Sequence, residues 1–185
     1  MSSAASKPVQ NDRTTQRPTG ADLAARAAQL RAANINPRTG LATDYLNHFN
    51  EAVMLLEMIP DIPECAEDFL AWTPLTYPEH FTHTNFKARD LVIEAFEMAE
   101  PAIREPFDHL TKTMTDILLA VGAAMREATQ DTTRAKLAEQ AAKWVKPLVS
   151  QAGGIINGEI EIDQDLDPVS EIDEVDAVDA IMASF

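Results

Sequence analysis

Two pairs of residues have types and spacing that could carry chemistry, one a histidine with a glutamate and the other two histidines. His48 lies three residues before Glu51, and His80 lies three residues before His83, so that each pair would share one side of a helix. Imidazole and carboxylate groups are ligands of zinc and iron in helical bundles, where all the ligands must converge on one ion at about 2.0–2.3 Å. These four residues therefore form a candidate site for Zn or Fe, which could serve a metal-dependent enzyme.

The order of these residues weakens the metal hypothesis. Ferritin-like di-iron sites use Glu-x-x-His on two helices, whereas His48 and Glu51 stand in the reverse order and no matching second motif is present. The ordinary interpretation is that the four side chains face solvent or make hydrogen bonds at helix ends. The sequence therefore favours a protein without a cofactor, and the metal-binding bundle is the alternative hypothesis.

Other reactive groups point away from catalysis. Cys65 has no nearby base or cation that would activate a thiol, so we expect it to be a core residue. The acids of 163–174 match the spacing of a calcium-binding loop, but Pro168 occupies the position that requires glycine. Phosphate-binding loops, nucleophile elbows and zinc-protease motifs are absent from the sequence. The sequence favours a non-enzymatic protein.

The elements that must position these residues read as helices. Apolar residues recur every three or four positions between residues 36 and 151, and proline, glycine and capping residues separate the runs. We expect helices over 41–59, 62–72, 76–86, 89–99 and 105–128, and a last one from 131 that Pro147 kinks or ends. The predicted fold is an all-α bundle of about five or six helices.

One heptad-like stripe is the most regular pattern in the chain. Its spacings alternate between three and four, as in a bundle helix or an intermolecular coiled coil. A bundle helix is favoured, because the charged flanking positions of a zipper are missing. The stripe consists of Phe107, Leu110, Met114, Ile117, Val121, Ala124 and Ala128.

The two ends of the chain differ from the bundle in composition. Residues 1–19 read as a disordered polar tail and 20–35 as a weak alanine-rich helix, which leaves 36–152 for the bundle domain. Residues 153–185 would begin with a Gly-Gly linker and continue through a short possible hairpin at the Asn-Gly pair of 157–158. They would end in an acidic-hydrophobic tail.

The charges of the chain exclude one class of partner. The net charge is -15, and residues 159–185 contain ten acids and no base. An acidic body repels phosphate backbones, so we expect no nucleic acid partner.

The most apolar stretch, 117–125, has nine residues, whereas a membrane span needs about 20, so no membrane partner is expected. A single cysteine and the lack of a secretory signal favour a cytoplasmic location.

The C-terminal segment (residues 163–185) carries the leading functional hypothesis. Its apolar side chains alternate with acids at nearly helical spacing, a pattern typical of segments that dock into a groove. We expect an adaptor or regulator whose partner is another protein with a basic-rimmed apolar groove. Two further possibilities are that the tail docks on its own core and that the basic residues of 1–40 attract it as a lid. The expected partner-binding residues are Ile172, Val175, Val178, Ile181, Met182 and Phe185.

Overall fold

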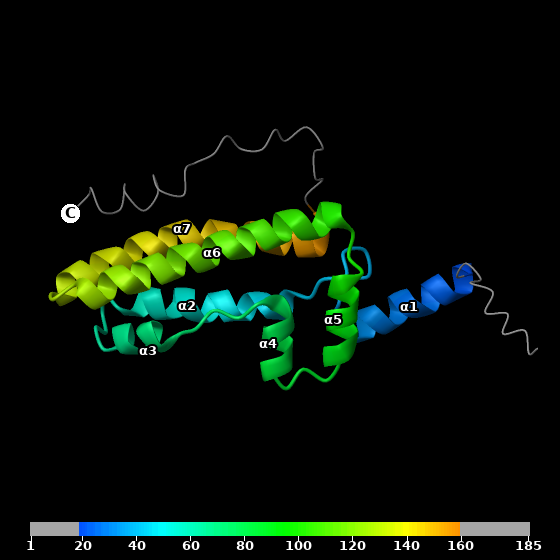
Figure 1. Cartoon of the computed structure of the whole chain (residues 1–185), viewed down its shortest axis with the longest axis horizontal. Coiled ribbons are helices and arrows are strands. Elements are labelled where there is room, and N and C mark those ends of the chain that lie inside the picture. Colours follow the sequence, from blue (N-terminus) through cyan, green and yellow to red (C-terminus); the bar gives the residue numbers. More distant parts are fainter. Residues whose placement is uncertain (1–18, 160–185) are drawn as a thin grey trace, which may run out of the picture.

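The computed structural model describes residues 19–159, and every regular element in that range is helical. Six α-helices, α2 to α7, form the bundle, which confirms the predicted all-α fold (Figure 1). The predicted tails before residue 19 and after residue 159 lie outside the described residues. The elements are α1 (Gly20–Ala32), a 3₁₀ turn (Thr43–Tyr45), α2 (Leu46–Met58), α3 (Cys65–Ala71), α4 (Tyr77–His83), α5 (Arg89–Glu97), α6 (Pro101–Glu127) and α7 (Asp131–Asn157).

Two long helices organise the bundle. The 27-residue helices α6 and α7 form an antiparallel hairpin, and α2 lies along it (Figure 1). The start of α2 lies opposite the end of α7, because the side chain of Leu46 approaches Gly153. Further along, Glu57 pairs with Lys146, so α2 and α7 are also antiparallel. The short helices α3 and α4 then flank α2 at its two ends (Figure 1).

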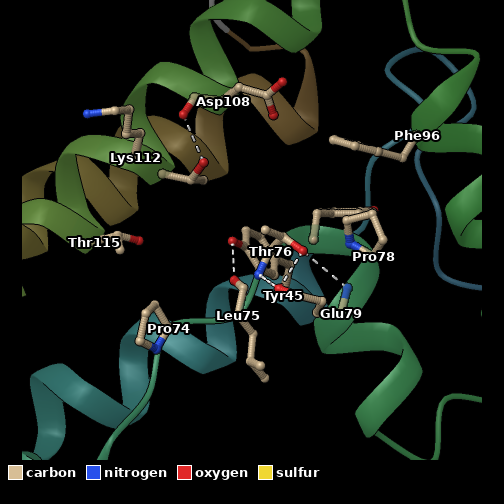
Figure 2. A pocket seen from close by; sticks show the side chains of 12 residues that line it. Tyr45, Pro74, Leu75, Thr76, Pro78, Glu79, Phe96, Asp108, Lys112 and Thr115 are labelled. Atoms are coloured by element: carbon tan, nitrogen blue, oxygen red, sulfur yellow. Dashed lines mark hydrogen bonds between the residues drawn. The ribbon is translucent and has the colours of Figure 1, made fainter.

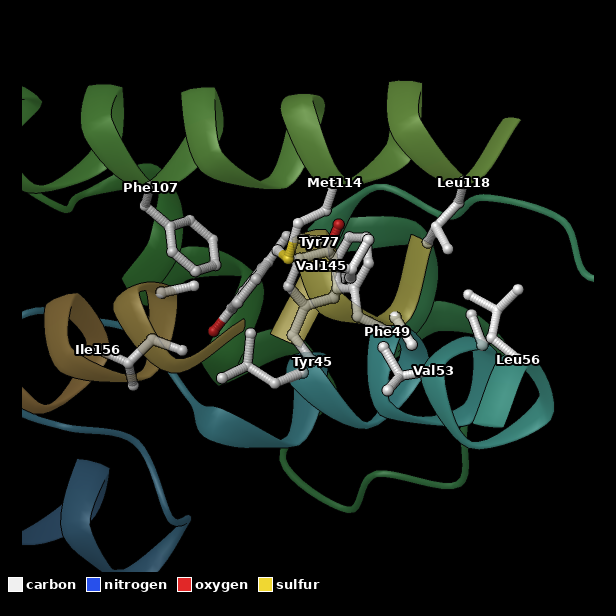
Figure 3. Close-up of a cluster of buried hydrophobic side chains, with 14 of the residues drawn as sticks. Tyr45, Phe49, Val53, Leu56, Tyr77, Phe107, Met114, Leu118, Val145 and Ile156 are labelled. Atoms are coloured by element: carbon white, nitrogen blue, oxygen red, sulfur yellow. The ribbon is translucent and has the colours of Figure 1, made fainter. Parts of the chain in front are cut away.

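The core lies where these three helices meet. Phe49 and Leu56 of α2, Met114 and Leu118 of α6 and Val145 of α7 point into one buried cluster (Figure 3). Burying side chains of this size stabilises the fold by about 1.5–3 kcal/mol each. The predicted apolar periodicity therefore positions the helices as expected.

The buried stripe of α6 differs in register from the predicted one. Met114 and Val121 are buried as expected, but Leu118 is buried while Ile117 is only partly covered. The structure adds Thr111 and Gly122 to the stripe, and these residues carry no apolar signal in the sequence. Gly122 faces Phe69 and Leu70 at the C-terminal end of α3, and this second neighbour turns the stripe away from the predicted seam.

The start of α6 also differs from the prediction. The helix begins at Pro101, five residues before Pro106, which was expected to open it. Pro101 occupies the first turn, where a proline costs no hydrogen bond. Pro106 lies inside the helix, where its ring removes one backbone donor.

The end of α7 corrects the predicted domain boundary. The helix continues through Pro147 and the pair Gly153-Gly154 to Asn157, so no linker begins at residue 153. Each glycine costs roughly 1 kcal/mol in a helix, but Ile155 and Ile156 are buried beyond them, and their burial stabilises the last turn by more.

The Asn-Gly pair ends this helix and does not form a hairpin. Gly158 has φ +67° at the helix C-terminus. Its amide donates to the carbonyl of Ile155 at 3.0 Å, and the amide of Glu159 donates to that of Gly154 at 2.9 Å. This is the Schellman pattern, which glycine favours because it lacks a Cβ. The predicted first arm of the hairpin is therefore helical.

A turn near the N-terminus fastens the end of α7. The Asn36 side chain and the Thr39 hydroxyl both donate to the carbonyl of Ile156, at 2.8 and 2.7 Å. The turn closes at Gly40, whose φ is +74° and whose backbone lies against the carbonyl of Ala95 on α5. Segments more than one hundred residues apart are thus held together by a carbonyl that the helix itself leaves unpaired.

The alanine-rich helix α1 makes a lighter contact with the bundle. A capping box between Thr19 and Asp22 stabilises the N-terminus of the helix. Leu30 is its buried residue, and Arg26 pairs with Glu94 of α5 at 2.8 Å. The remainder of α1 projects from the body (Figure 1).

Candidate functional site

His48 of α2 is a core residue. Its ring is 7% exposed and stacks on Trp72 with a centroid separation of 4.6 Å. The Nε2 atom accepts a hydrogen bond from the backbone amide of Leu75 at 3.0 Å, so the ring is neutral at that nitrogen. Burial, with a smaller contribution from His80, lowers the pKa of His48 to about 4.

His80 of α4 lies beside His48 and is also buried. The two ring centroids are 6.1 Å apart. Burial lowers the pKa of His80, while the carboxylate of Asp44 and a hydrogen bond with the Asp44 backbone act in the opposite direction. The structure therefore brings together the two histidines that the sequence placed in one site.

Glu51 and His83, the other two candidate ligands, do not join them. Glu51 is exposed on α2. His83 is exposed at the end of α4, where its Nδ1 lies 2.7 Å from the carbonyl of Glu79 in the same helix. Within residues 19–159, no three His, Cys, Asp or Glu side chains are grouped so that they could hold a metal ion.

His48 and Trp72 hold the loop between α3 and α4 in place. While His48 accepts from the Leu75 amide, the indole of Trp72 donates to the His48 carbonyl at 3.2 Å. The segment between α3 and α4 is therefore fastened to α2 at two points. This segment forms one wall of a groove, so His48, one of the candidate ligands, helps to position that surface.

A groove between α4 and α6, here called the α4–α6 groove, has a volume of about 740 Å³ (Figure 2). This volume lies in the range of ligand and peptide sites, roughly 300–1,000 Å³. Its walls come from the 3₁₀ turn before α2, the loop before α4, the start of α4, the end of α5 and one face of α6. The lining residues are Tyr45, Pro74, Leu75, Thr76, Tyr77, Pro78, Glu79, Phe96, Asp108, Thr111, Lys112 and Thr115.

The polar groups on the loop side of the groove are engaged in the fold. The Tyr45 hydroxyl donates to the Leu75 carbonyl at 2.8 Å, and the Tyr77 hydroxyl accepts from the Ala42 amide at 2.8 Å. Burial raises the pKa of both tyrosines, so neither phenol serves as a base near neutral pH. Glu79 accepts from the Thr76 amide and hydroxyl as part of a capping box, which lowers the pKa of its carboxyl (Figure 2).

The charged groups on the α6 side also have structural partners. Asp108 lies 3.6 Å from the guanidinium of Arg104, which in turn stacks over the ring of Phe96 at 5.3 Å. Burial raises the pKa of Asp108, and Arg104 opposes this shift. Lys112 pairs with Asp116 at 2.6 Å. The groove thus presents a fixed apolar surface, and none of its lining residues is a histidine or a cysteine.

Sequence reasoning did not find this groove, because its walls come from five separate segments of the chain. The available signal was local: the capping box at Thr76 and Glu79, flanked by Pro74 and Pro78, marks a rigid loop. Cys65 is free and buried, as the sequence predicts. The predicted partner-binding residues of 172–185 lie outside the described residues.

No family model, curated protein or solved structure matches this chain. Among residues 19–159, no helix combines the length and the apolar character that crossing a membrane requires.

Proposed function

We propose that this chain is a non-enzymatic adaptor or regulator that docks on a partner protein through its C-terminal segment. The observation that carries the proposal is the distribution of apolar side chains along the sequence. In the described residues, buried apolar side chains run from Leu30 to Ile156, the last turn of α7. A cap then ends that helix at Gly158, and the apolar residues of 172–185 follow it in an acidic context. Exposed apolar side chains of this kind need a cover, and the interior of the bundle is already packed.

The body supports a binding role over a catalytic one. The α4–α6 groove is mainly apolar, and the phenol groups of Tyr45 and Tyr77 and the carboxylates of Glu79 and Asp108 make hydrogen bonds or ion pairs within the fold. A catalytic pocket needs an acid, base or nucleophile free to meet a substrate. A rigid concave surface with engaged polar groups is typical of a binding site.

The segment has enough apolar surface for measurable affinity. Burial of three or four side chains such as Val178, Ile181 and Phe185 contributes about 1.5–3 kcal/mol each. After the cost of ordering the segment, micromolar dissociation constants, near -8 kcal/mol, are within reach. The interleaved acids select a partner whose groove has a basic rim.

A comparison of three full-length or shortened chains tests the proposal. The intact chain, a chain lacking 163–185, and a Val178→Ser, Ile181→Ser, Phe185→Ser variant are immobilised, and the proteins that each retains from its own cell extract are identified. The expected result is one protein retained by the intact chain alone, which a synthetic peptide of 163–185 displaces when both components are purified.

Thermal stability provides the control. Deletion of an adaptor segment removes the retained protein and lowers the melting temperature of the bundle by a few degrees at most. If deletion lowers the melting temperature by several degrees and no retained protein is lost, the segment is part of the fold and the proposal is wrong.

A further inference from the structure

A stripe of exposed apolar residues lies on α2 and just beyond its end. Met54 and Met58 are one helical turn apart on α2 and are 53% and 37% exposed, and Ile62, which follows the helix, is 44% exposed. Methionine is a flexible and polarisable side chain that adapts to different partners. An exposed stripe of this kind marks a surface that another element covers.

A shallow groove runs beside this stripe, between α2 and α7. Its volume is about 260 Å³, and Val53 and Met54 of α2 face Val149 and Ser150 of α7 across it. The pair between Glu57 and Lys146 crosses one end at 2.5 Å, which neutralises the carboxylate there. We call this feature the α2–α7 groove.

Helix α7, which forms one wall of this groove and contributes Lys146 to its lining, has a positive net charge. It carries Arg134, Lys136, Lys143 and Lys146 against Asp131 and Glu139, so its net charge is +2 in a chain of net charge -15. Lys136 and Lys143 are exposed and seven residues apart, on one face of the helix.

We infer that the α2–α7 groove holds the chain's own C-terminal residues 172–185 as an amphipathic helix when no partner is bound. The segment has the matching chemistry, since four acids interleave with its apolar anchors. The acids face the lysines of α7, and the anchors lie on the methionine stripe. The inference rests on the proposed function, because it makes the docking segment self-covered until a partner competes for it.

The chain is long enough for this contact. From Asn157 back to Ser150 is about 10 Å along α7, at 1.5 Å per residue. Residues 159–171 can span up to about 40 Å when extended. A 14-residue helix is about 21 Å long, close to the length of α2. The segment can therefore reverse direction and lie along the groove without strain.

Methyl NMR of the full-length chain tests the inference, with a soluble paramagnetic agent that broadens exposed methyl groups. Met54, which lines the groove, and Met58, one turn further along α2, report on the docked segment, and Met98, which is 73% exposed outside the groove, is the internal control. In the intact chain, the paramagnetic agent should broaden the Met54 and Met58 methyl signals less than the exposed fractions of these residues in the bundle predict. In the Val178→Ser, Ile181→Ser, Phe185→Ser variant this protection should vanish, while Met98 stays unchanged.

Charge reversal provides a second arm. Lys136→Glu with Lys143→Glu should lower the ratio of docked to free segment by about fivefold, for two surface pairs lost. The matched control, Lys87→Glu with Arg89→Glu, changes two exposed bases at the start of α5 and should have no effect.

Unchanged Met54 and Met58 signals in the serine variant overturn the inference. Protection that rises with protein concentration also overturns it, since the occupant is then a second copy of the chain. Both results are read without a partner protein. If a partner is still captured through 163–185, the proposed function stands while the self-docked state does not.

Discussion

The buried His48 makes the stability of the fold depend on pH. Its pKa falls to about 4 in the folded chain, against about 6.5 in an unfolded one. The unfolded state therefore takes up a proton first as the pH falls, so this group stabilises the fold above pH 6.5 and that stability is lost below it. His80, whose pKa is also lowered by burial, acts in the same direction.

The size of the effect follows from the two pKa values. Between pH 6.5 and pH 5 the unfolded chain is protonated at His48 and the folded chain mostly is not. That interval of about 1.5 pH units costs about 1.4 kcal/mol per unit, or about 2 kcal/mol of unfolding free energy. A proton on Nε2 of His48 in the folded chain would remove the acceptor for the Leu75 amide. The hydrogen bond from Leu75 and protonation of His48 therefore oppose each other.

Urea unfolding at pH 7 and pH 5 measures this contribution. His48→Gln keeps an acceptor for the amide of Leu75 but does not titrate, so its stability should fall between these pH values by about 2 kcal/mol less than that of the parent chain. His109→Gln, at an exposed histidine on α6, is the matched control and should retain the full dependence. An equal loss in the parent and the His48→Gln variant would refute the assignment of His48 as a neutral core residue.

Two further substitutions test the fold, each beside its own control. Gly40→Ala should destabilise the bundle by about 1–3 kcal/mol, because φ is +74° there and a Cβ would lie 2.6 Å from the Ala95 carbonyl oxygen. Gly20→Ala, where a Cβ meets nothing within 4 Å, should be neutral or slightly stabilising in chemical denaturation; equal losses at both positions would contradict the turn geometry. Leu118→Ala should cost about 2–5 kcal/mol and Leu119→Ala less than about 1 kcal/mol, since the first side chain is 1% exposed and the second 48%. A reversed order in melting temperatures would show that the register of α6 is wrong.

The sequence predicted which candidate residues lie together better than it predicted what they contact. It placed His48 and His80 in one hypothetical site, and the structure does bring their rings together. Their role differs, because His48 is paired with a backbone amide and buried under Trp72. Residue types and spacing show which side chains share a helix face, but they do not show what fills the space opposite that face.

Local pattern alone determined that the described chain is helical and roughly where each helix lies, because the 3.6-residue period is a property of each segment by itself. The tertiary structure decided where packing against distant residues overrides the local helix preference. Ile155 and Ile156 carry α7 across two glycines because their burial stabilises the helix by more than the glycines cost. Likewise, α3 selects Leu118 over Ile117 by lying against one side of α6. These outcomes depend on apolar area removed from water by distant neighbours, and that quantity exists only once the neighbours are in place.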